Sequence, residues 1–401
     1  MALRGRRLTL AYLVLSVTLA AVHVATAPGV PIDLEVYRRA GEAVLGGGDQ
    51  VYRGGDGALP FTYPPFSAAL FTGLALVPAG VVTFLVAALS YLGLSTIVGL
   101  SVRHLGIDRR LGVPVVLLAA LTEPVAETVR FGQVKLILAA LVLVDLLVLM
   151  PRRSRAAGLL LSVAICVKLT PAIFLLVPLV NREWRTLART AVASAVLTVV
   201  PALVMPASWL DFWTRAVWSP ERVGGVEFLS NQSVKGAVWR AAGPGGFPVV
   251  TALLVVAVVL VTLLAARRAG DRDALATVLL VALCGLFVSP ISWIHHWVWT
   301  LPLMLWLVAP GRAGRSRRQP VLVGLGVAWL VATTTRVMWL APSGGGREYS
   351  ASLAAKLLSD AYAVLGLASL VAVSAVLVAG PGRNTPAYRL LTPDAAGASS
   401  R

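Results

Sequence analysis

The sequence predicts an all-α polytopic membrane protein, a bundle of about twelve transmembrane helices with further helices lying outside the bilayer. Composition is the first reason: 58% of the 401 residues are hydrophobic and only 13% are charged, whereas soluble domains carry about 25% charged residues. The second reason is that apolar runs of about 20 residues, enough to cross a bilayer core of about 30 Å, recur from end to end. Helices are expected rather than open sheets, because unpaired sheet edges cannot be satisfied in lipid.

Hydropathy marks the individual spans, and one of them is ambiguous. If the run 156–180 formed one helix, it would bury Lys168 at mid-bilayer, at a cost of about 2.5–3.5 kcal/mol. Two short helices broken at Lys168–Pro171 instead place the lysine at the outer face, and Pro171 suits a helix start. With these two, twelve spans are predicted, the others near residues 8–28, 81–102, 112–126, 134–150, 187–205, 247–266, 274–290, 295–309, 321–340 and 356–379.

Loop charges predict the orientation. With the N-terminus inside, the segments on the cytoplasmic side carry 22 arginines and five acidic residues, which accounts for the whole net charge of +17, as the positive-inside rule expects. We therefore predict a multi-pass protein of the plasma membrane with both termini cytoplasmic, the C-terminal tail being 381–401. Residues 1–380 form one predicted membrane domain, whose external segments are 29–65, 123–133, 206–246, 291–295 and 341–355, with an interfacial helix at 66–79.

Several function classes are disfavoured by the same pattern. The positive charge is divided among short loops and forms no patch, so no nucleic-acid partner is expected. Cys166 and Cys284 both lie inside apolar runs, which favours reduced core residues over a disulfide or a CxxC metal site. The first apolar segment resembles a signal peptide, but its length of about 20 residues favours a signal-anchor. No metal or other cofactor is predicted.

The stretch that follows the first apolar segment is the leading candidate for catalysis. It carries Asp33, Glu35 and Tyr37 where the chain leaves the bilayer. A carboxylate held at a membrane surface can take a proton from a sugar hydroxyl while the other substrate stays in lipid. The structural alternative is that Asp33 caps a helix over Leu34–Leu45, and capping does not exclude catalysis.

Two external segments carry cationic candidates for binding a phosphate. Lys168 stands alone among apolar residues; it either snorkels to the interface or provides a point charge for a lipid phosphate. His295 and His296 are adjacent, so on a helix they point about 100° apart, and no HExxH pattern accompanies them. A hydrogen bond to a phosphate is favoured over a metal, and the alternative is polar residues within an aromatic belt.

Two more external segments mix polar and aromatic residues. Residues 123–135 bring Glu123 and Gln133 together with Arg130, either as substrate contacts or as an ordinary loop with an internal Glu127–Arg130 pair. Residues 206–246 combine dense tryptophans, typical of an interfacial belt, with Asn231 and Gln232, whose amides are suited to sugar hydroxyls. Asp145 and Asp360 lie near the ends of spans, where helix-packing hydrogen bonds are favoured over a proton relay.

Six blocks of the sequence, in order, resemble glycosyltransferase family 87, the actinobacterial polyprenol-phosphate-mannose-dependent α-(1→2)-mannosyltransferases of the GT-C class. The resemblance covers about residues 5–380, and at Lys135 the chain departs from the asparagine usual in the family. The blocks are PIDLEVYRRAGEAVLGG, LPFTYPPF, EPVAETVRFGQVKLIL, VKLTPAIFLLVPLV, LSNQSVKGAVWR and SPISWIHHWVW.

The resemblance implies a GT-C-type bundle with its active site on the extracytoplasmic face, and inversion at the anomeric carbon. It matches Asp33 to the catalytic aspartate in the first external loop. A mannosyl residue would then pass from a polyprenyl-phosphate donor to a glycolipid or glycan acceptor. Candidates for the donor phosphate are Lys168, His295, His296, Arg130 and Lys235, and those for the sugars are Glu35, Tyr37, Glu123, Gln133, Asn231 and Gln232.

Other functions remain open at this point. Relatives on the same scaffold transfer arabinofuranose from a polyprenyl phosphate, and the sequence does not separate the two sugars. A transporter or lipid flippase predicts internal repeats and mid-helix ionisable residues, and both are scarce here. A purely structural membrane protein predicts no cluster of acids, amides and cations on one face.

Overall fold

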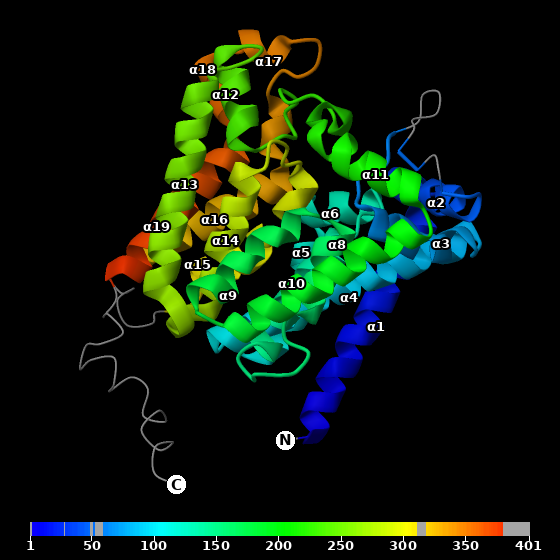
Figure 1. The fold of residues 1–401 in the computed structure, drawn as a ribbon. Coiled ribbons are helices and arrows are strands. Elements are labelled where there is room, and N and C mark those ends of the chain that lie inside the picture. The colour runs from blue at the N-terminus through cyan, green and yellow to red at the C-terminus, as the bar shows by residue number, and fades with distance from the viewer. Residues whose placement is uncertain (1, 28, 49–50, 53–58, 311–317, 380–401) are drawn as a thin grey trace.

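Helices account for every regular element that the computed structural model describes, over residues 2–27, 29–48, 51–52, 59–310 and 318–379 (Figure 1). The predicted cytoplasmic tail, 381–401, lies outside these residues. The α-helices are α1 (Ala2–Thr26), α2 (Ile32–Leu45), α3 (Pro65–Ala75), α4 (Ala79–Leu105), α5 (Gly112–Ala120), α6 (Glu123–Arg130), α7 (Lys135–Val144), α8 (Leu159–Val167), α9 (Leu176–Val180), α10 (Trp184–Val199), α11 (Pro206–Thr214), α12 (Val234–Ala242), α13 (Pro248–Ala269), α14 (Ala274–Val288), α15 (Thr300–Val308), α16 (Gln319–Thr335), α17 (Arg347–Ser350), α18 (Leu353–Ser359) and α19 (Ala361–Ala379).

Short 3₁₀ segments and one π-helical turn join or extend these helices. The π-helical turn is η2 (Asp145–Leu149), where Asp145 accepts hydrogen bonds from the backbone N–H groups of Gly158 (2.7 Å) and Leu161 (2.8 Å). The predicted packing role of that carboxylate is thus confirmed. The 3₁₀ segments are η1 (Arg109–Leu111), η3 (Thr170–Leu175), η4 (Val200–Leu203), η5 (Ala216–Trp218), η6 (Pro220–Val223), η7 (Gly270–Asp273), η8 (Ile294–Trp299) and η9 (Val337–Leu340).

The long apolar helices divide into a central one and peripheral ones. In the most apolar stretch of α4, 61% of the residues are buried, against 11% in that of α1, 17% in α10–η4 and 22% in α13. The peripheral helices therefore present apolar side chains outward, as helices facing lipid do. Within the described residues, five helices are long and apolar enough to cross a membrane, or six if the bent α5–α6 pair is one span. The chain is a multi-pass membrane protein, and the number of twelve spans stays a prediction.

Several predicted spans are interrupted by breaks at polar residues or prolines. The predicted helix 112–126 is wrong in its boundary, because α5 ends at Ala120 and α6 begins at Glu123, with an angle of 68° between the two parts. Pro124 lies in the first turn of α6, where its missing N–H costs nothing. The predicted span 356–379 is likewise divided between α18 and α19 at Asp360. The break predicted at Lys168 is confirmed: α8 ends at Val167, and Lys168 has extended backbone angles.

The hydrophobic core is centred on aromatic side chains from the C-terminal half. Trp297 and Trp329 are fully buried, with ring centroids 5.8 Å apart, and Tyr362 stands edge-on to both. Cys166 and Cys284 are buried free thiols, as predicted. Edge-to-face pairs of this kind are worth about 0.5–1.5 kcal/mol beyond their buried area, so this cluster anchors η8, which carries the two histidines, to α16 and α19.

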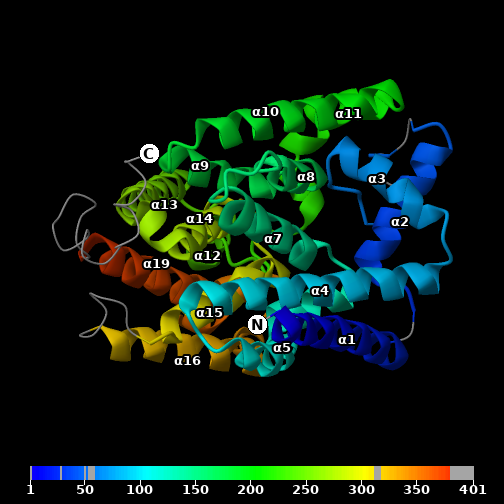
Figure 2. The same cartoon turned by 90° about the horizontal axis from the view of Figure 1, so that it is seen from below.

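The connections fall at two ends of the bundle. In Figure 1, the start of α1 lies at the lower end, whereas α2, α11, α12, α17 and α18 lie toward the upper end. Figure 2 shows α1 alongside α4, with α2 and α3 packed together at one side of the bundle. The α2–α3 contact is close, because a Cβ added at Gly41 would lie 2.3 Å from the Phe71 carbonyl oxygen. Helix α2 is therefore held tightly at the upper end.

Candidate active site

Asp33 lies in the first turn of α2 and is not its cap. The helix begins at Ile32, the N-cap position is Pro31, and no side chain caps it. The capping alternative considered for Asp33 is therefore wrong, and its carboxylate is available to the space beside the helix. Glu35, two residues further, is exposed and lies outside the cavity described below.

A turn between α6 and α7 brings Gln133 beside Asp33. The Asp33 N–H donates to the Phe131 carbonyl oxygen at 3.0 Å. Gly132 then adopts a φ of +71°, and a Cβ there would lie 2.9 Å from the Cβ atoms of both Leu34 and Pro31. Only glycine adopts this positive φ without strain and also lacks the Cβ that would collide with Leu34 and Pro31. The next residue, Gln133, is buried, and its side chain hydrogen-bonds to the Asp33 carboxylate.

Six of the predicted site residues line one cavity of about 390 Å³. This volume is within the range of about 300–1,000 Å³ typical of small-molecule sites. The lining residues come from six segments of the chain: the start of α2, the Tyr63 turn, the α6–α7 turn, the Lys168 break, residues 212–223 and residues 289–296. The predicted residues among them are Asp33, Tyr37, Gln133, Lys168, His295 and His296.

A chain of hydrogen bonds joins the lysine to the aspartate. The Lys168 ammonium donates to the Tyr63 hydroxyl at 3.1 Å, and that hydroxyl donates to Gln133 Oε1 at 2.8 Å. Tyr37 is within hydrogen-bonding distance of both, at 2.7 Å from the Tyr63 oxygen and 3.2 Å from Gln133 Oε1. Because its oxygen accepts from the tyrosines, the Gln133 amide directs its NH₂ group toward Asp33.

The surroundings of Asp33 change its acidity. Burial raises the pKa of its carboxyl above the ordinary value of 3.8, while the hydrogen bond from Gln133 and the charges of Lys168 and Lys135 act in the opposite direction. Desolvation has the larger effect, so the group is a stronger base than a solvent-exposed aspartate. A carboxylate of this kind is suited to accept a proton from a hydroxyl.

The two histidines both reach the cavity although they are adjacent in sequence. Their ring centroids are 4.8 Å apart, and the Phe131 ring stands edge-on to His295 at 5.7 Å. Thr128 on α6 donates to the His295 carbonyl oxygen at 3.3 Å. Packing of α6 against η8 therefore fixes the histidines opposite Asp33 and Lys168.

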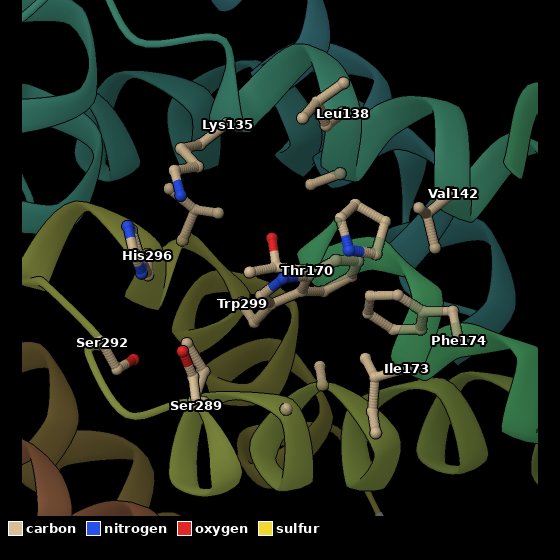
Figure 3. Close-up of a pocket in the computed structure, with 16 residues that line it drawn as sticks. Lys135, Leu138, Val142, Thr170, Ile173, Phe174, Ser289, Ser292, His296 and Trp299 are labelled. Atoms are coloured by element: carbon tan, nitrogen blue, oxygen red, sulfur yellow. The ribbon is translucent and has the colours of Figure 1, made fainter. Parts of the chain in front are cut away.

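A second, smaller cavity of about 70 Å³ adjoins the first and shares Thr170, Ser289 and His296 with it. Figure 3 shows its two ends: Lys135 points toward His296 on the polar side, and Leu138, Val142, Ile173 and Phe174 line the other side. A cavity that is polar at one end and apolar at the other suits a charged head group on a hydrocarbon chain.

Two of the predicted phosphate ligands lie elsewhere. Arg130 pairs with Glu127 at 2.5 Å, its side chain is 59% exposed, and Arg336 also contacts Glu127 at 3.4 Å. Lys235 lies over the Trp239 ring, 5.4 Å from its centroid. Neither lines a cavity described here. The internal Glu127–Arg130 pair is present, but it lies on helix α6 and not in a loop.

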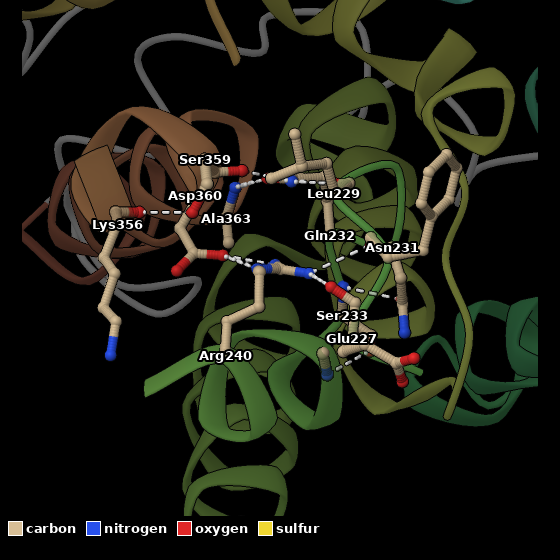
Figure 4. A network of polar contacts seen from close by, with 12 residues as sticks. Glu227, Leu229, Asn231, Gln232, Ser233, Arg240, Lys356, Ser359, Asp360 and Ala363 are labelled. Carbon is tan, nitrogen blue, oxygen red and sulfur yellow. Dashed lines mark hydrogen bonds and ion pairs between the residues drawn. The ribbon is translucent and has the colours of Figure 1, made fainter. Parts of the chain in front are cut away.

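Three predicted sugar ligands are used to hold the fold together instead. Glu123 is buried and accepts from Trp339 Nε1 (2.5 Å) and the Tyr362 hydroxyl (2.9 Å). Asn231 donates to the Val226 and Pro290 carbonyl oxygens, and Gln232 donates to those of Leu229 and Ser359 (Figure 4). Their polar groups are satisfied within the protein, and none of the three lines a cavity.

The same network contains a buried ion pair. Arg240 is fully buried, and its Nε donates to Asp360 Oδ1 at 2.9 Å (Figure 4). Its Nη2 also donates to Asp360 Oδ1, and its Nη1 donates to the carbonyl oxygens of Glu227 and Phe228. The predicted packing role of Asp360 is therefore confirmed.

Sequence reasoning missed several residues that line the cavities. Tyr63 lies in the LPFTYPPF block, but nothing in that block indicates that its hydroxyl bridges Lys168 and Gln133. Lys135 departs from the family pattern, and the sequence indicates no role for it. Arg222 and Trp293 also line the larger cavity, although both lie far from Asp33 in the sequence.

Comparison of the chain with known proteins identifies its family. The family model for glycosyltransferase family 87 matches residues 61–290. A Mycolicibacterium smegmatis protein named polyprenol-phosphate-mannose-dependent α-(1-2)-phosphatidylinositol pentamannoside mannosyltransferase is 38% identical over 321 residues, 77% of this chain and 76% of its own length. A Mycobacterium tuberculosis protein named polyprenol-phosphate-mannose-dependent α-(1-2)-phosphatidylinositol mannoside mannosyltransferase is 33% identical over 396 residues, 90% of this chain and 88% of its own. No solved structure matches the chain. The chain therefore belongs to glycosyltransferase family 87.

Proposed function

We propose that this glycosyltransferase moves a mannosyl residue from a polyprenyl-phosphate-mannose donor to a phosphatidylinositol mannoside, forming an α-(1→2) bond with inversion. The observation that carries the proposal is the single cavity where Asp33 faces Lys168 and the two histidines. The relatives named above support the choice of donor and acceptor.

The proposed reaction is a single displacement. Asp33 accepts the proton of an acceptor hydroxyl, and the oxygen forms a bond to C1 of the mannose as the bond from C1 to the phosphate oxygen breaks. The leaving polyprenyl phosphate takes the electron pair and gains negative charge. Lys168, His295 and His296 are proposed to face that charge, because donors fixed in advance stabilise a developing anion. Tyr37 and Gln133 are proposed to position the sugar and the base.

The lipid tail of the donor is proposed to leave the cavity through its apolar neighbour. Leu138, Val142 and Phe174 line that smaller space, while Lys135 and His296 stand at the end nearer Asp33. This arrangement would hold the phosphate at the junction, with the sugar on the Asp33 side.

We also propose that the site faces the extracytoplasmic space. The arginine-rich loops support this, since the 22 arginines on the segments assigned to the cytoplasm follow the positive-inside rule. The upper end of the bundle in Figure 1, which carries α2, α11 and α12, is then external. Labelling of single cysteines placed on either end, with a reagent that does not cross membranes, tests this orientation.

The transfer itself is tested with purified protein in lipid nanodiscs. Polyprenyl phosphomannose and a phosphatidylinositol mannoside acceptor are supplied, and the product is analysed for sugar and linkage. We expect an α-(1→2)-linked mannose on the acceptor. Arabinose transfer from polyprenyl phosphoarabinose, with none from the mannose donor, would contradict the proposed sugar while leaving the family membership in place.

The dependence of the reaction on pH follows from the acidity of Asp33. Since burial raises the pKa of its carboxyl above 3.8, the basic form is lost at a higher pH than for an ordinary aspartate. We expect kcat/KM to be full above the raised pKa and to fall about tenfold per pH unit below it. Steady-state rates between pH 4 and 8, with folding followed by tryptophan fluorescence at each pH, check this. A kcat/KM that stays full down to pH 4 would contradict the role of Asp33 as a desolvated base.

A further inference from the structure

Lys135 is a buried cation that the mechanism above does not use. It is the first residue of α7, its side chain is only 8% exposed, and it lines the smaller cavity where that cavity meets the larger one. Among the described residues, no carboxylate forms an ion pair with its ammonium group. A lysine held in this way is costly unless an anion compensates it.

The ammonium groups of Lys135 and Lys168 lie near each other where the two cavities meet. The ammonium of Lys135 lies close enough to that of Lys168 for the two to interact, and both interact with the Asp33 carboxylate. Like charges in a poorly solvated space repel, so the pair is unfavourable without a bound anion. Among the described residues that line the two cavities, Asp33 is the single carboxylate. Arg222 also lines the larger cavity, where its guanidinium donates to the Tyr52 carbonyl oxygen. At the junction itself, the two lysines and Asp33 leave one positive charge in excess.

This excess positive charge suits both the donor-bound state and the product-bound state of the proposed reaction. The donor is a phosphodiester with one negative charge, which neutralises the excess while Asp33 is ionised. After transfer, Asp33 carries the proton and the polyprenyl phosphate is a monoester with a charge of about −1.5 to −2. The two ammonium groups then neutralise the product. With Lys168 alone, both states would carry an uncompensated negative charge in a desolvated cavity.

We propose that Lys135 is the second ammonium group on the lipid phosphate, and that it balances the charge of the site against Asp33 throughout the reaction. The inference rests on the proposed function and extends it to the recognition of the phosphate. His295 and His296 add hydrogen-bonding nitrogens that need no charge to donate. A consequence is that ionisation of Asp33 after transfer leaves the product with an unmatched charge and favours its release.

Binding measurements on a set of variants test the charge balance. The probes are a short-chain polyprenyl phosphomannose and the corresponding polyprenyl monophosphate, titrated calorimetrically at pH 7 onto the full-length protein in nanodiscs. We expect Lys135→Met to weaken donor binding about 10- to 100-fold, the loss of a hydrogen bond between charged groups. Adding Asp33→Asn restores donor affinity to within a few-fold of wild type without restoring transfer. Asp33→Asn alone binds the monophosphate more tightly than wild type does.

The matched control is Lys356→Met, which removes the same charge from a lysine outside both cavities, whose ammonium donates to the Ala241 carbonyl oxygen. It should bind both probes as wild type does. If Lys135→Met fails to fold, as judged by thermal unfolding, Lys135→Gln replaces it in the same cycle. Wild-type affinity in Lys135→Met, or no recovery in the double variant, overturns the role of Lys135. Failure of the wild-type protein to bind either lipid overturns the proposed function instead.

Discussion

Replacement of Asp33 by asparagine is expected to lower kcat for mannose transfer by about 10²- to 10⁴-fold, the usual contribution of a positioned general base. Asparagine is nearly the same size and retains hydrogen bonding, but it cannot accept the proton of the acceptor hydroxyl. Turnover of polyprenyl phosphomannose by purified protein in nanodiscs measures the effect. Donor binding should persist, because the lysines that face the phosphate are unchanged.

The asparagine variant should also fold. The pKa of the Asp33 carboxyl is raised on folding, so the folded protein binds this proton more tightly than the unfolded chain does. The charged form therefore contributes unfavourably to stability above the raised pKa, and that contribution disappears as pH falls through it. Removal of the charge at neutral pH should leave the unfolding temperature unchanged or slightly higher.

Glu42→Gln is the matched control for Asp33→Asn. It neutralises an exposed carboxylate on the same helix, α2, away from the cavity. Its turnover should equal that of the wild-type protein. Wild-type turnover in Asp33→Asn at normal expression would reject Asp33 as the base and leave the proposed displacement without a proton acceptor.

Replacement of Lys168 by methionine is expected to lower kcat by about 10²- to 10³-fold, as loss of one preorganised donor to a developing anion does. The charge on the leaving phosphate grows during bond breaking, so the effect on kcat should exceed the effect on KM. The substitution also removes the donor to the Tyr63 hydroxyl at 3.1 Å. Steady-state kinetics with varied donor concentration separates kcat from KM.

Two companion variants separate the charge of Lys168 from its packing. Lys168→Arg keeps a positive charge at the helix break and should retain more turnover than Lys168→Met. Lys356→Met removes a lysine outside the cavities and should have no effect on turnover. Equal turnover in Lys168→Met and wild-type protein would exclude Lys168 from the phosphate site.

The sequence alone determined the class of the protein and pointed to Asp33 and Lys168 as candidate site residues. Apolar runs predicted a helical membrane protein, and the cost of burying Lys168 predicted the break that the structure has after Val167. The place of Asp33 just beyond the first apolar helix, together with six ordered blocks, indicated the family that the comparisons show. These features are local: hydrophobicity, charge and proline act on the residues that carry them.

The tertiary structure decided which of the polar groups share a cavity. Glu123, Asn231 and Gln232 have the chemistry to hold a sugar, yet each is bonded to a distant part of the fold. Tyr63 and Lys135 showed no pattern of their own, and they reach the site because α7, η3 and η8 pack around one space. Residue type tells what a side chain can do, but its direction depends on contacts between segments far apart in the chain. The Asp33–Gln133 pair shows this most clearly, because it exists only where Gly132 lets the α6–α7 turn approach the start of α2.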